Sequence, residues 1–507
     1  MTRAAPILSW VFLAALAAAV SYYSLGQYDH NDHMYAVAPV LLQHARLYAD
    51  FGFVQTPLSA LLFAGIFKLT GPMPFYAVLR IVSLALNLAV VALGMFLCRR
   101  HAVHKTFAGF IFAGLYLWLS QTAAIGAEIG NYTLTLILAA LALLCLDLFR
   151  AKAWGTFAVG LCAGLSLSAK MSSVFLLIAF ALLCVTPQPR GVRKTALFGL
   201  GALTGTLPII YYLIGDPEKF LFENIHFHYL SNIYRGIAPI GAGSGLAFFS
   251  VGSGAFAIGL LLAAALAGWA GWKLAQRLWP QASALTLTGF EKAVLVFAAA
   301  AIVGAVTPGV IFQQYYAAPA FAIFLFLALF LDRQPQAVRF AAAMVLVLLG
   351  SWRIFDLVPQ AAARQAAGTY AITAVPVTRD RLAKVVGTMD RAHPGCHGDL
   401  VTAFGVPAIG AGVKLSPIAS AGSFAMRLDY IFVANAPTWR WLSDATRYLT
   451  PGSLILTGFY NDTSDEPRSD FESVMNDYAA RNHFVRIPLG SFMNRMIFLN
   501  APASCTT

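Results

Sequence analysis

Long apolar stretches, separated by short polar segments, fill the first 356 residues. A helix needs about 20 apolar residues to cross a bilayer, and about 17 suffice. Eleven stretches reach or approach this length: 7–25, 76–97, 106–122, 131–149, 154–169, 172–187, 195–214, 245–270, 293–308, 315–331 and 339–356. This pattern predicts an all-α polytopic transmembrane protein with about 11 helices.

Composition and charge agree with this prediction. Hydrophobic residues make up 59% of the chain and charged residues 11%, which excludes an ordinary soluble domain. A net charge of +12 suggests nucleic acid as a partner of a soluble protein. Here the basic residues cluster in short loops between the apolar stretches, which is the positive-inside pattern, so we expect membrane lipid and no nucleic acid as a partner.

The charges alternate between the two sides of the membrane. The basic side carries Arg3, Arg99, Arg100, Lys105, Arg150, Lys152, Arg190, Arg193, Lys194, Lys273, Arg277, Lys292, Arg333 and Arg339. The opposite side carries Asp29, Asp32, Asp50, Glu128, Asp216, Glu218 and Glu223. The basic side is cytoplasmic by the positive-inside rule, so the C-terminus lies outside. Residues 7–25 also fit a cleavable signal peptide, but a retained helix keeps the alternation in phase.

The composition changes after Asp356. An amphipathic helix, VTRDRLAKVVGTMDRA, is followed by the strand-like runs DLVTAF, YIFVAN and SLILTGF. We therefore expect two domains: a transmembrane domain over 1–356, with a first outer loop at 26–75, and a small outer α/β domain over 357–507. Cys396 and Cys505 both lie in this outer domain, where an oxidising compartment allows a disulfide.

The first outer loop holds the densest group of polar residues, in QYDHNDHMYAVAPVLLQHARLYADFGFVQTPL. Asp29 and Asp32 are three residues apart, so on a helix their carboxylates share a face. Such a pair suits a general base or a cation site that neutralises a phosphate, and Asp29, Asp32 and His33 are the candidate ligands of a metal. The alternative is a solvated loop in which Asp32 caps the next helix.

Two cations lie on the outer side, against the positive-inside bias. Lys170 interrupts the apolar run GLCAGLSLSAKMSSVFLL, and Arg80 begins the second span. Each either extends to lipid headgroups or holds the phosphate of a lipid substrate. Glu128 lies in a tight outer turn, and the Tyr315–Tyr316 pair either anchors a helix at the interface or contributes to a site.

These residues stand in motifs that resemble the GT-C superfamily of membrane glycosyltransferases, especially the bacterial protein O-mannosyltransferase and lipid A aminoarabinose transferase type. The first loop resembles the family's acidic first periplasmic loop. FYAVLRIVSLALNL resembles its arginine-bearing second span, GLCAGLSLSAKMSSVFLL its lysine span and QQYYAAPAFAIFLF its late Tyr/Pro span. The resemblance covers about residues 1–330.

The resemblance implies an inverting glycosyltransferase that moves a hexosyl or related sugar from a polyprenyl-phosphate donor to an acceptor hydroxyl on a glycan, lipid or protein of the cell envelope. It implies the bacterial inner membrane, with the C-terminal domain in the periplasm. Asp29 or Asp32 matches the catalytic acid, and Lys170 and Arg80 match the phosphate ligands. Substrate-binding candidates and a second acid come from a wider set: Glu128, Asp50, Gln55, Tyr315 and Tyr316.

The sequence also departs from the family pattern. It has Asp29-His30 or Asp32-His33 where many members have Asp-Glu, and Gln55-Thr56-Pro57 where the aminoarabinose-transferase branch has Lys-Pro-Pro. These departures leave open which aspartate is the base, whether a divalent cation takes part, and which sugar and acceptor are used. A transporter or flippase of lipid-linked saccharides remains the alternative, although it would place charges at mid-membrane. A ligase is the other alternative, usually marked by a large late loop.

Overall fold

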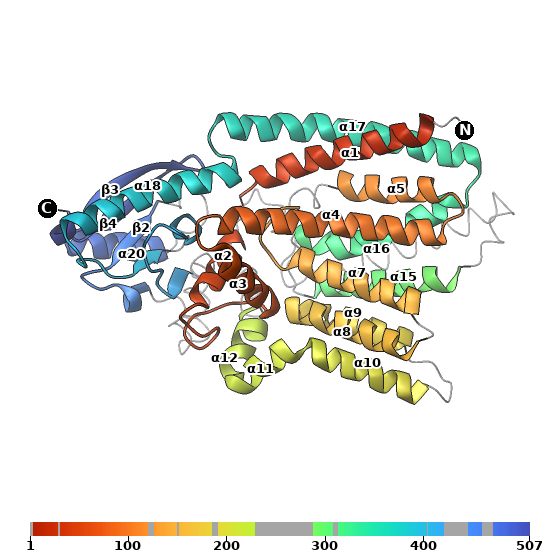
Figure 1. The fold of residues 1–507 in the computed structure, drawn as a ribbon, viewed down its shortest axis with the longest axis horizontal. Coiled ribbons are helices and arrows are strands. Elements are labelled where there is room, and N and C mark those ends of the chain that lie inside the picture. The colour runs from red at the N-terminus through yellow and green to blue at the C-terminus, as the bar shows by residue number, and fades with distance from the viewer. Residues whose placement is uncertain are drawn as a thin grey trace.

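The computed structural model describes residues 4–28, 31–119, 126–149, 152–184, 191–228, 287–307, 313–402, 404–419, 445–458 and 470–506. A bundle of long helices makes up one end of the molecule and a small α/β domain the other (Figure 1). The α/β domain contains the last strand and lies beyond the ends of the bundle helices. This arrangement confirms the predicted fold class, an all-α membrane domain with a small C-terminal α/β domain.

Ten of the eleven predicted spans coincide with helices of the bundle, and the stretch 245–270 lies outside the described residues. The helices are α1 (Ala4–Gly26), α4 (Phe75–His101), α5 (Lys105–Trp118), α7 (Tyr132–Phe149), α8 (Ala153–Ala169), α9 (Val174–Cys184), α10 (Gly191–Gly205), α11 (Leu207–Gly215), α15 (Gly289–Val306), α16 (Ala317–Asp332) and α17 (Gln336–Ala366). Within the described part, six helices are long and apolar enough to cross a membrane, or seven if α10 and α11 count as one.

The stretch 195–214 is a bent pair of helices, where the sequence predicted a single span. Helices α10 and α11 meet at an angle of 58° around Thr206. Pro208 lies at the start of α11, and a proline in the first turn has no N–H to continue the hydrogen-bond ladder of the preceding helix. The bend therefore has a local cause in the sequence.

Helices α8 and α10 pack backbone against backbone. Gly160 and Gly164 on α8 face Gly201 and Gly205 on α10, and a Cβ atom at any of the four would collide with backbone atoms of the other helix. Both helices thus carry a G-x-x-x-G pattern at their contact. Such small-residue contacts let transmembrane helices gain van der Waals packing that lipid cannot provide.

The first loop folds into two short helices between the bundle and the α/β domain (Figure 1). Helix α2 (Asn31–Leu41) is buried along almost its whole length, and α3 (Leu58–Thr70) follows it. Behind them lie α12 (Pro217–Leu221) and the π-helical turn η2 (Phe222–His226). A loop helix buried on all sides has its position fixed by its neighbours, so the polar residues at its start are held in one place.

The C-terminal domain combines a long helix with a mixed sheet. Helix α18 (Ala371–Ala392) leads into β1 (Leu400–Thr402), β2 (Leu454–Thr457), α20 (Asp470–Arg481), β3 (Val485–Phe492) and β4 (Arg495–Ala501). The strand order is β1-β2-β4-β3, with β1 and β2 parallel and the other pairs antiparallel. The run YIFVAN lies outside the described residues. Cys396 and Cys505 form a disulfide in this domain.

The C-terminal domain contacts the bundle at two places. Tyr370, just before α18, packs against Gly26 and donates a hydrogen bond of 2.5 Å to the carbonyl oxygen of Tyr22 at the end of α1. The His33 ring lies edge-on to the Phe404 ring, with centroids 4.3 Å apart. The first loop is therefore enclosed by the bundle on one side and by the C-terminal domain on the other.

Candidate functional site

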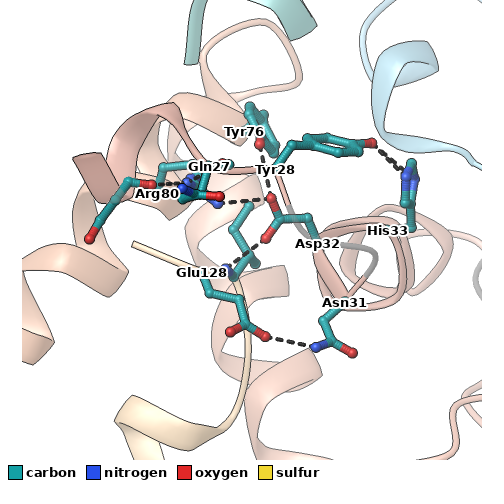
Figure 2. A network of polar contacts seen from close by, with 10 residues as sticks. Gln27, Tyr28, Asn31, Asp32, His33, Tyr76, Arg80 and Glu128 are labelled. Atoms are coloured by element: carbon teal, nitrogen blue, oxygen red, sulfur yellow. Dashed lines mark hydrogen bonds and ion pairs between the residues drawn. The ribbon is translucent and has the colours of Figure 1, made fainter. Parts of the chain in front are cut away.

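Asp32, in the first turn of α2, lies at the centre of a buried polar cluster (Figure 2). One carboxylate oxygen accepts hydrogen bonds from Arg80 Nη1 at 2.9 Å and from the Tyr76 hydroxyl at 2.9 Å. The other accepts one from the backbone N–H of Ile129 at 2.8 Å. We call Asp32, Arg80, Tyr76 and the Ile129 amide the Asp32 cluster. It joins three chain segments that lie far apart in the sequence.

Arg80 is fully enclosed by this cluster and by the end of α1. It donates to the carbonyl oxygen of Ser24 and, at 2.6 Å, to that of Gln27. Tyr76 and Arg80 are four residues apart on α4 and therefore share one helix face, which is the face toward Asp32. The Arg80 side chain is 1% exposed, so a donor phosphate would reach its guanidinium only after this packing had changed.

Glu128 lies beside the Asp32 cluster and points toward the start of α2 (Figure 2). Its carboxylate accepts a hydrogen bond of 2.8 Å from the amide of Asn31. It interacts electrostatically with Arg80 on one side and with Lys170 on the other. Glu128 therefore connects the Asp32 cluster with a second charged position.

That second position is Lys170, the residue at which α8 ends. Its ammonium group lies over two aromatic rings, 3.7 Å from the centroid of Tyr132 and 4.0 Å from that of Tyr315. Such cation–π contacts stabilise a desolvated ammonium group without neutralising it. The two rings therefore fix the position of the ammonium group, which also lines a pocket.

A small pocket opens around Lys170, with a volume of about 40 Å³. This volume is about three times the roughly 10–15 Å³ that one water molecule needs, so a small polar group fits. Ser172, Ser173, Thr135 and Gln314 also line it, and we call it the Lys170 pocket. The Thr135 hydroxyl is buried and has no hydrogen-bond partner among the described residues. Hydroxyl donors around one cation form a suitable environment for an anion.

Asn131 links the first loop to the Lys170 pocket. Its amide group donates hydrogen bonds of 2.9 Å to the side-chain oxygen of Gln55 and of 2.9 Å to the carbonyl oxygen of Ala169, the residue before Lys170. Asn131 is fully buried. Gln55, Asn131 and Lys170 are thus held in a fixed order across three chain segments.

The remaining predicted residues lie in different surroundings. Asp50 forms a surface pair with Arg46 at 2.8 Å, and hydrogen bonds from Arg46 hold the pKa of Asp50 below its ordinary value. Tyr316 is exposed, unlike its neighbour Tyr315 in the Lys170 pocket. Asp29 lies outside the described residues.

The metal interpretation finds no geometric support within the described part of the chain. No three His, Cys, Asp or Glu side chains there gather closely enough to hold an ion. The His33 ring nitrogen Nε2 lies 2.5 Å from the Tyr28 hydroxyl (Figure 2). Asp32 is bound to Arg80. Both described candidates therefore already have protein partners, which fits a positioning role.

Four residues of this region were not among the predicted site residues: Asn31, Tyr76, Asn131 and Glu223, the last of which was noted only as an acid of the outer side. Tyr76 was detectable, because it stands one helical turn before Arg80. Glu223 is completely buried and accepts the N–H of Phe53 at 2.5 Å, while its other oxygen has no partner among the described residues. Burial raises the pKa of Glu223 well above its ordinary value. Its packing against a segment 170 residues earlier leaves no local signal in the sequence.

Neither a protein-family model nor a curated protein matches the chain. Solved structures do match, among them two of ArnT from Cupriavidus metallidurans, one bound to undecaprenyl phosphate and one in the apo state. Each is 13% identical and aligns over 97% of this chain and 98% of ArnT, with a TM-score of 0.53. At this identity the likeness speaks for the fold. The chain therefore has a fold similar to that of ArnT, and six of its described helices are long and apolar enough to cross a membrane.

Proposed function

We propose that this protein is an inverting glycosyltransferase of the bacterial inner membrane. It moves a sugar from a polyprenyl-phosphate donor to an acceptor hydroxyl on the periplasmic side. The observation that carries the proposal is the position of Lys170, whose ammonium group lies in a small pocket with several hydroxyl groups. Glu128 links this position to the buried loop helix that carries Asp32. A transfer of this kind needs both a positive site for the leaving phosphate and a base for the acceptor proton.

In this proposal Asp32 positions the loop and Asp29 is the base. Both oxygens of Asp32 already accept hydrogen bonds, and its charge balances the buried Arg80. If Asp32 were protonated, Arg80 would be left as an uncompensated buried cation, which is costly. The Asp32 cluster fixes the start of helix α2. Asp29 precedes this helix start by two residues in the sequence. Asp29 then takes the proton as the acceptor oxygen attacks the anomeric carbon.

Lys170 is the proposed ligand of the donor phosphate. As the bond between the anomeric carbon and the phosphate oxygen breaks, negative charge grows on the phosphate, and a fixed cation stabilises that charge most at this stage. Thr135 and Ser172 add hydroxyl donors within the same pocket. Arg80 acts here through Asp32, as a positioning residue. Glu128 accepts the hydrogen bond from Asn31, and its negative charge partly offsets the positive charge of Lys170.

The likeness to ArnT supports a transferase over a transporter. One of the ArnT structures holds undecaprenyl phosphate, a lipid of the polyprenyl-phosphate class. The same fold over 97% of this chain supports the same class of carrier here.

The test is transfer from radiolabelled polyprenyl-phosphate sugars in membranes from cells that express the wild type or a lysine variant. We expect Lys170→Ala to lower transfer by about tenfold to a hundredfold, the range for losing a charged hydrogen bond. Lys68→Ala is the control, because Lys68 is an exposed lysine of the first loop and does not line the Lys170 pocket. Equal transfer by wild type and Lys170→Ala, at equal membrane levels, would overturn the role of Lys170. No wild-type transfer from any donor would overturn the proposed function.

A further inference from the structure

The C-terminal domain carries a groove of its own, apart from the Lys170 pocket. It lies between helix α18 and strand β3, and Cys505 and Thr506 line one part of it. Its volume of about 500 Å³ is within the range of ligand sites, roughly 300–1,000 Å³. None of the residues discussed so far as catalytic candidates lines this groove.

The groove combines a basic rim with an apolar floor. Arg381 and Lys384 are one turn apart on α18 and share a helix face, and His393 follows the end of the same helix. Val385, Ile487 and Pro488 provide the accessible apolar part, while Met389 and Leu489 also line the groove but are buried. No acidic side chain of the described residues lines the groove. The two acids next in sequence to this helix face are both paired, Asp380 with Arg379 and Asp390 with His397.

A β-bulge makes room for the guanidinium of Arg381. The register of β3 against β4 shifts between Pro488 and Gly490, and Gly490 has φ +93°. A Cβ atom at Gly490 would meet the flexible end of the Arg381 side chain, and the backbone angle itself favours glycine there. Arg381 donates one hydrogen bond, to the Leu489 carbonyl oxygen at 3.4 Å. A guanidinium has five N–H donors, which leaves several for a ligand.

The distance between the groove and the membrane domain determines which kinds of anion can reach the groove. Helix α18 begins beside the end of α1 and runs away from the bundle (Figure 1). At 1.5 Å per residue, Arg381 lies about 15 Å along this helix and its end about 30 Å. The headgroup layer on each side of a bilayer is only roughly 5–8 Å thick. With the membrane surface placed at Gly26, where the first apolar span ends beside the start of α18, lipid headgroups stop short of the groove. An anion that reaches the groove then stands well out from the membrane.

We propose that this groove binds an anionic saccharide chain, with its charged groups on Arg381 and Lys384 and the apolar faces of its sugar rings on Val385 and Pro488. A saccharide chain has both kinds of surface and extends from a membrane or into solution. The further statement that the bound saccharide is the acceptor of the transfer, or is joined to the acceptor, rests on the proposed function. The binding itself does not.

The experiment measures binding of short dextran sulfate to the purified full-length protein in detergent, at 150 mM salt and without donor. Neutral dextran of the same length is the ligand control. We expect the double variant Arg381→Gln/Lys384→Gln to bind dextran sulfate at least about tenfold more weakly than the wild type. Arg481→Gln is the control variant, because Arg481 is 81% exposed on α20 and does not line the groove. It should bind as the wild type does.

Two results would contradict the proposal that the groove binds an anionic saccharide. One is equal weakening by the double variant and by Arg481→Gln, which would mean that the net charge of +12 attracts the polyanion without a site. The other is binding that the double variant leaves unchanged. If the double variant instead loses binding to phosphatidylglycerol vesicles and keeps dextran sulfate, the groove takes lipid and the saccharide proposal is wrong. Since no donor is present, failure here leaves the proposed transfer reaction intact, and failure of transfer leaves saccharide binding intact.

Discussion

The carboxylate of Asp32 and the guanidinium of Arg80 lie 2.9 Å apart, with their side chains 0% and 1% exposed. This ion pair joins the first turn of the loop helix α2 to the membrane helix α4. Tyr76 and the Ile129 amide satisfy further lone pairs of the carboxylate, as a buried pair requires. The pair therefore fixes the loop helix relative to the membrane domain.

Removing one partner of this pair should destabilise the protein strongly. We expect Arg80→Leu to lower the free energy of unfolding by about 3–5 kcal/mol, because it leaves the Asp32 charge buried and uncompensated. Tyr76→Phe removes one neutral donor to a charged acceptor and should cost about 1.5–3 kcal/mol. Thermal unfolding in detergent measures both effects. A double variant, Asp32→Leu/Arg80→Met, should recover much of the loss, and Arg80→Leu melting like the wild type would contradict the structural role.

The aromatic rings beside Lys170 should matter for transfer. We expect Tyr132→Leu to lower transfer by about twofold to thirtyfold, because a cation–π contact stabilises the ammonium group by about 0.5–2 kcal/mol and fixes its position. Tyr132→Phe keeps the ring and should retain most of the activity. Rates from radiolabelled donor, normalised to the amount of folded protein, distinguish the two variants. Equal loss in both would assign the effect to the hydroxyl.

Stability should depend on pH through Glu223. Burial raises the pKa of this carboxyl well above its ordinary value of 4.5, although the Phe53 N–H and Lys219 partly oppose the shift. Between the two pKa values the folded chain holds a proton that the unfolded chain has lost. The free energy of unfolding therefore falls as pH rises through that window.

The matched variants are Glu223→Gln and Glu218→Gln. Glutamine stays neutral and keeps an oxygen for the Phe53 N–H, so Glu223→Gln should flatten the dependence of the melting temperature on pH above 4.5. Glu218 is exposed on the adjacent helix α12, and Glu218→Gln should leave the dependence unchanged. An identical pH profile for wild type and Glu223→Gln would show that this carboxyl does not carry the effect.

The contact between α8 and α10 should tolerate no side chain at its glycines. We expect Gly201→Ala to lower the melting temperature, because the added methyl group meets the backbone of α8. Gly199→Ala is the control on the same helix, where a Cβ atom meets nothing within 4 Å. That change should be neutral, or stabilising by about 0.5–1 kcal/mol through helix propensity. Equal effects of the two changes would argue against close backbone packing.

The sequence predicted the membrane helices well because each one carries its own signal. A run such as that of α4 is apolar on every face, so its length alone marks a span. The strands β1 and β2 and the helix α18 were also readable from local patterns. The bend at Thr206 was not predicted, because its proline was taken as part of one continuous apolar run.

The sequence predicted the charged residues of the site but not the contacts between them. Asp32, Arg80, Glu128 and Lys170 stood out because charge is rare in apolar surroundings. Their pairing was not predictable, since the Asp32–Arg80 contact spans 48 residues and the Asn31–Glu128 contact spans 97. The sequence indicated either lipid headgroups or a donor phosphate as the partner of Arg80, and its contact with Asp32 was not predicted.

The measurement that tests the account most directly compares Asp29→Asn with Asp32→Asn for both transfer and melting temperature. We expect Asp29→Asn to fold like the wild type and to lose about a hundredfold or more in transfer, as removal of a general base does. We expect Asp32→Asn to melt lower and to accumulate less in the membrane. If Asp29→Asn transfers sugar at the wild-type rate, or if Asp32→Asn melts like the wild type and loses transfer alone, the assigned roles of the two aspartates are wrong.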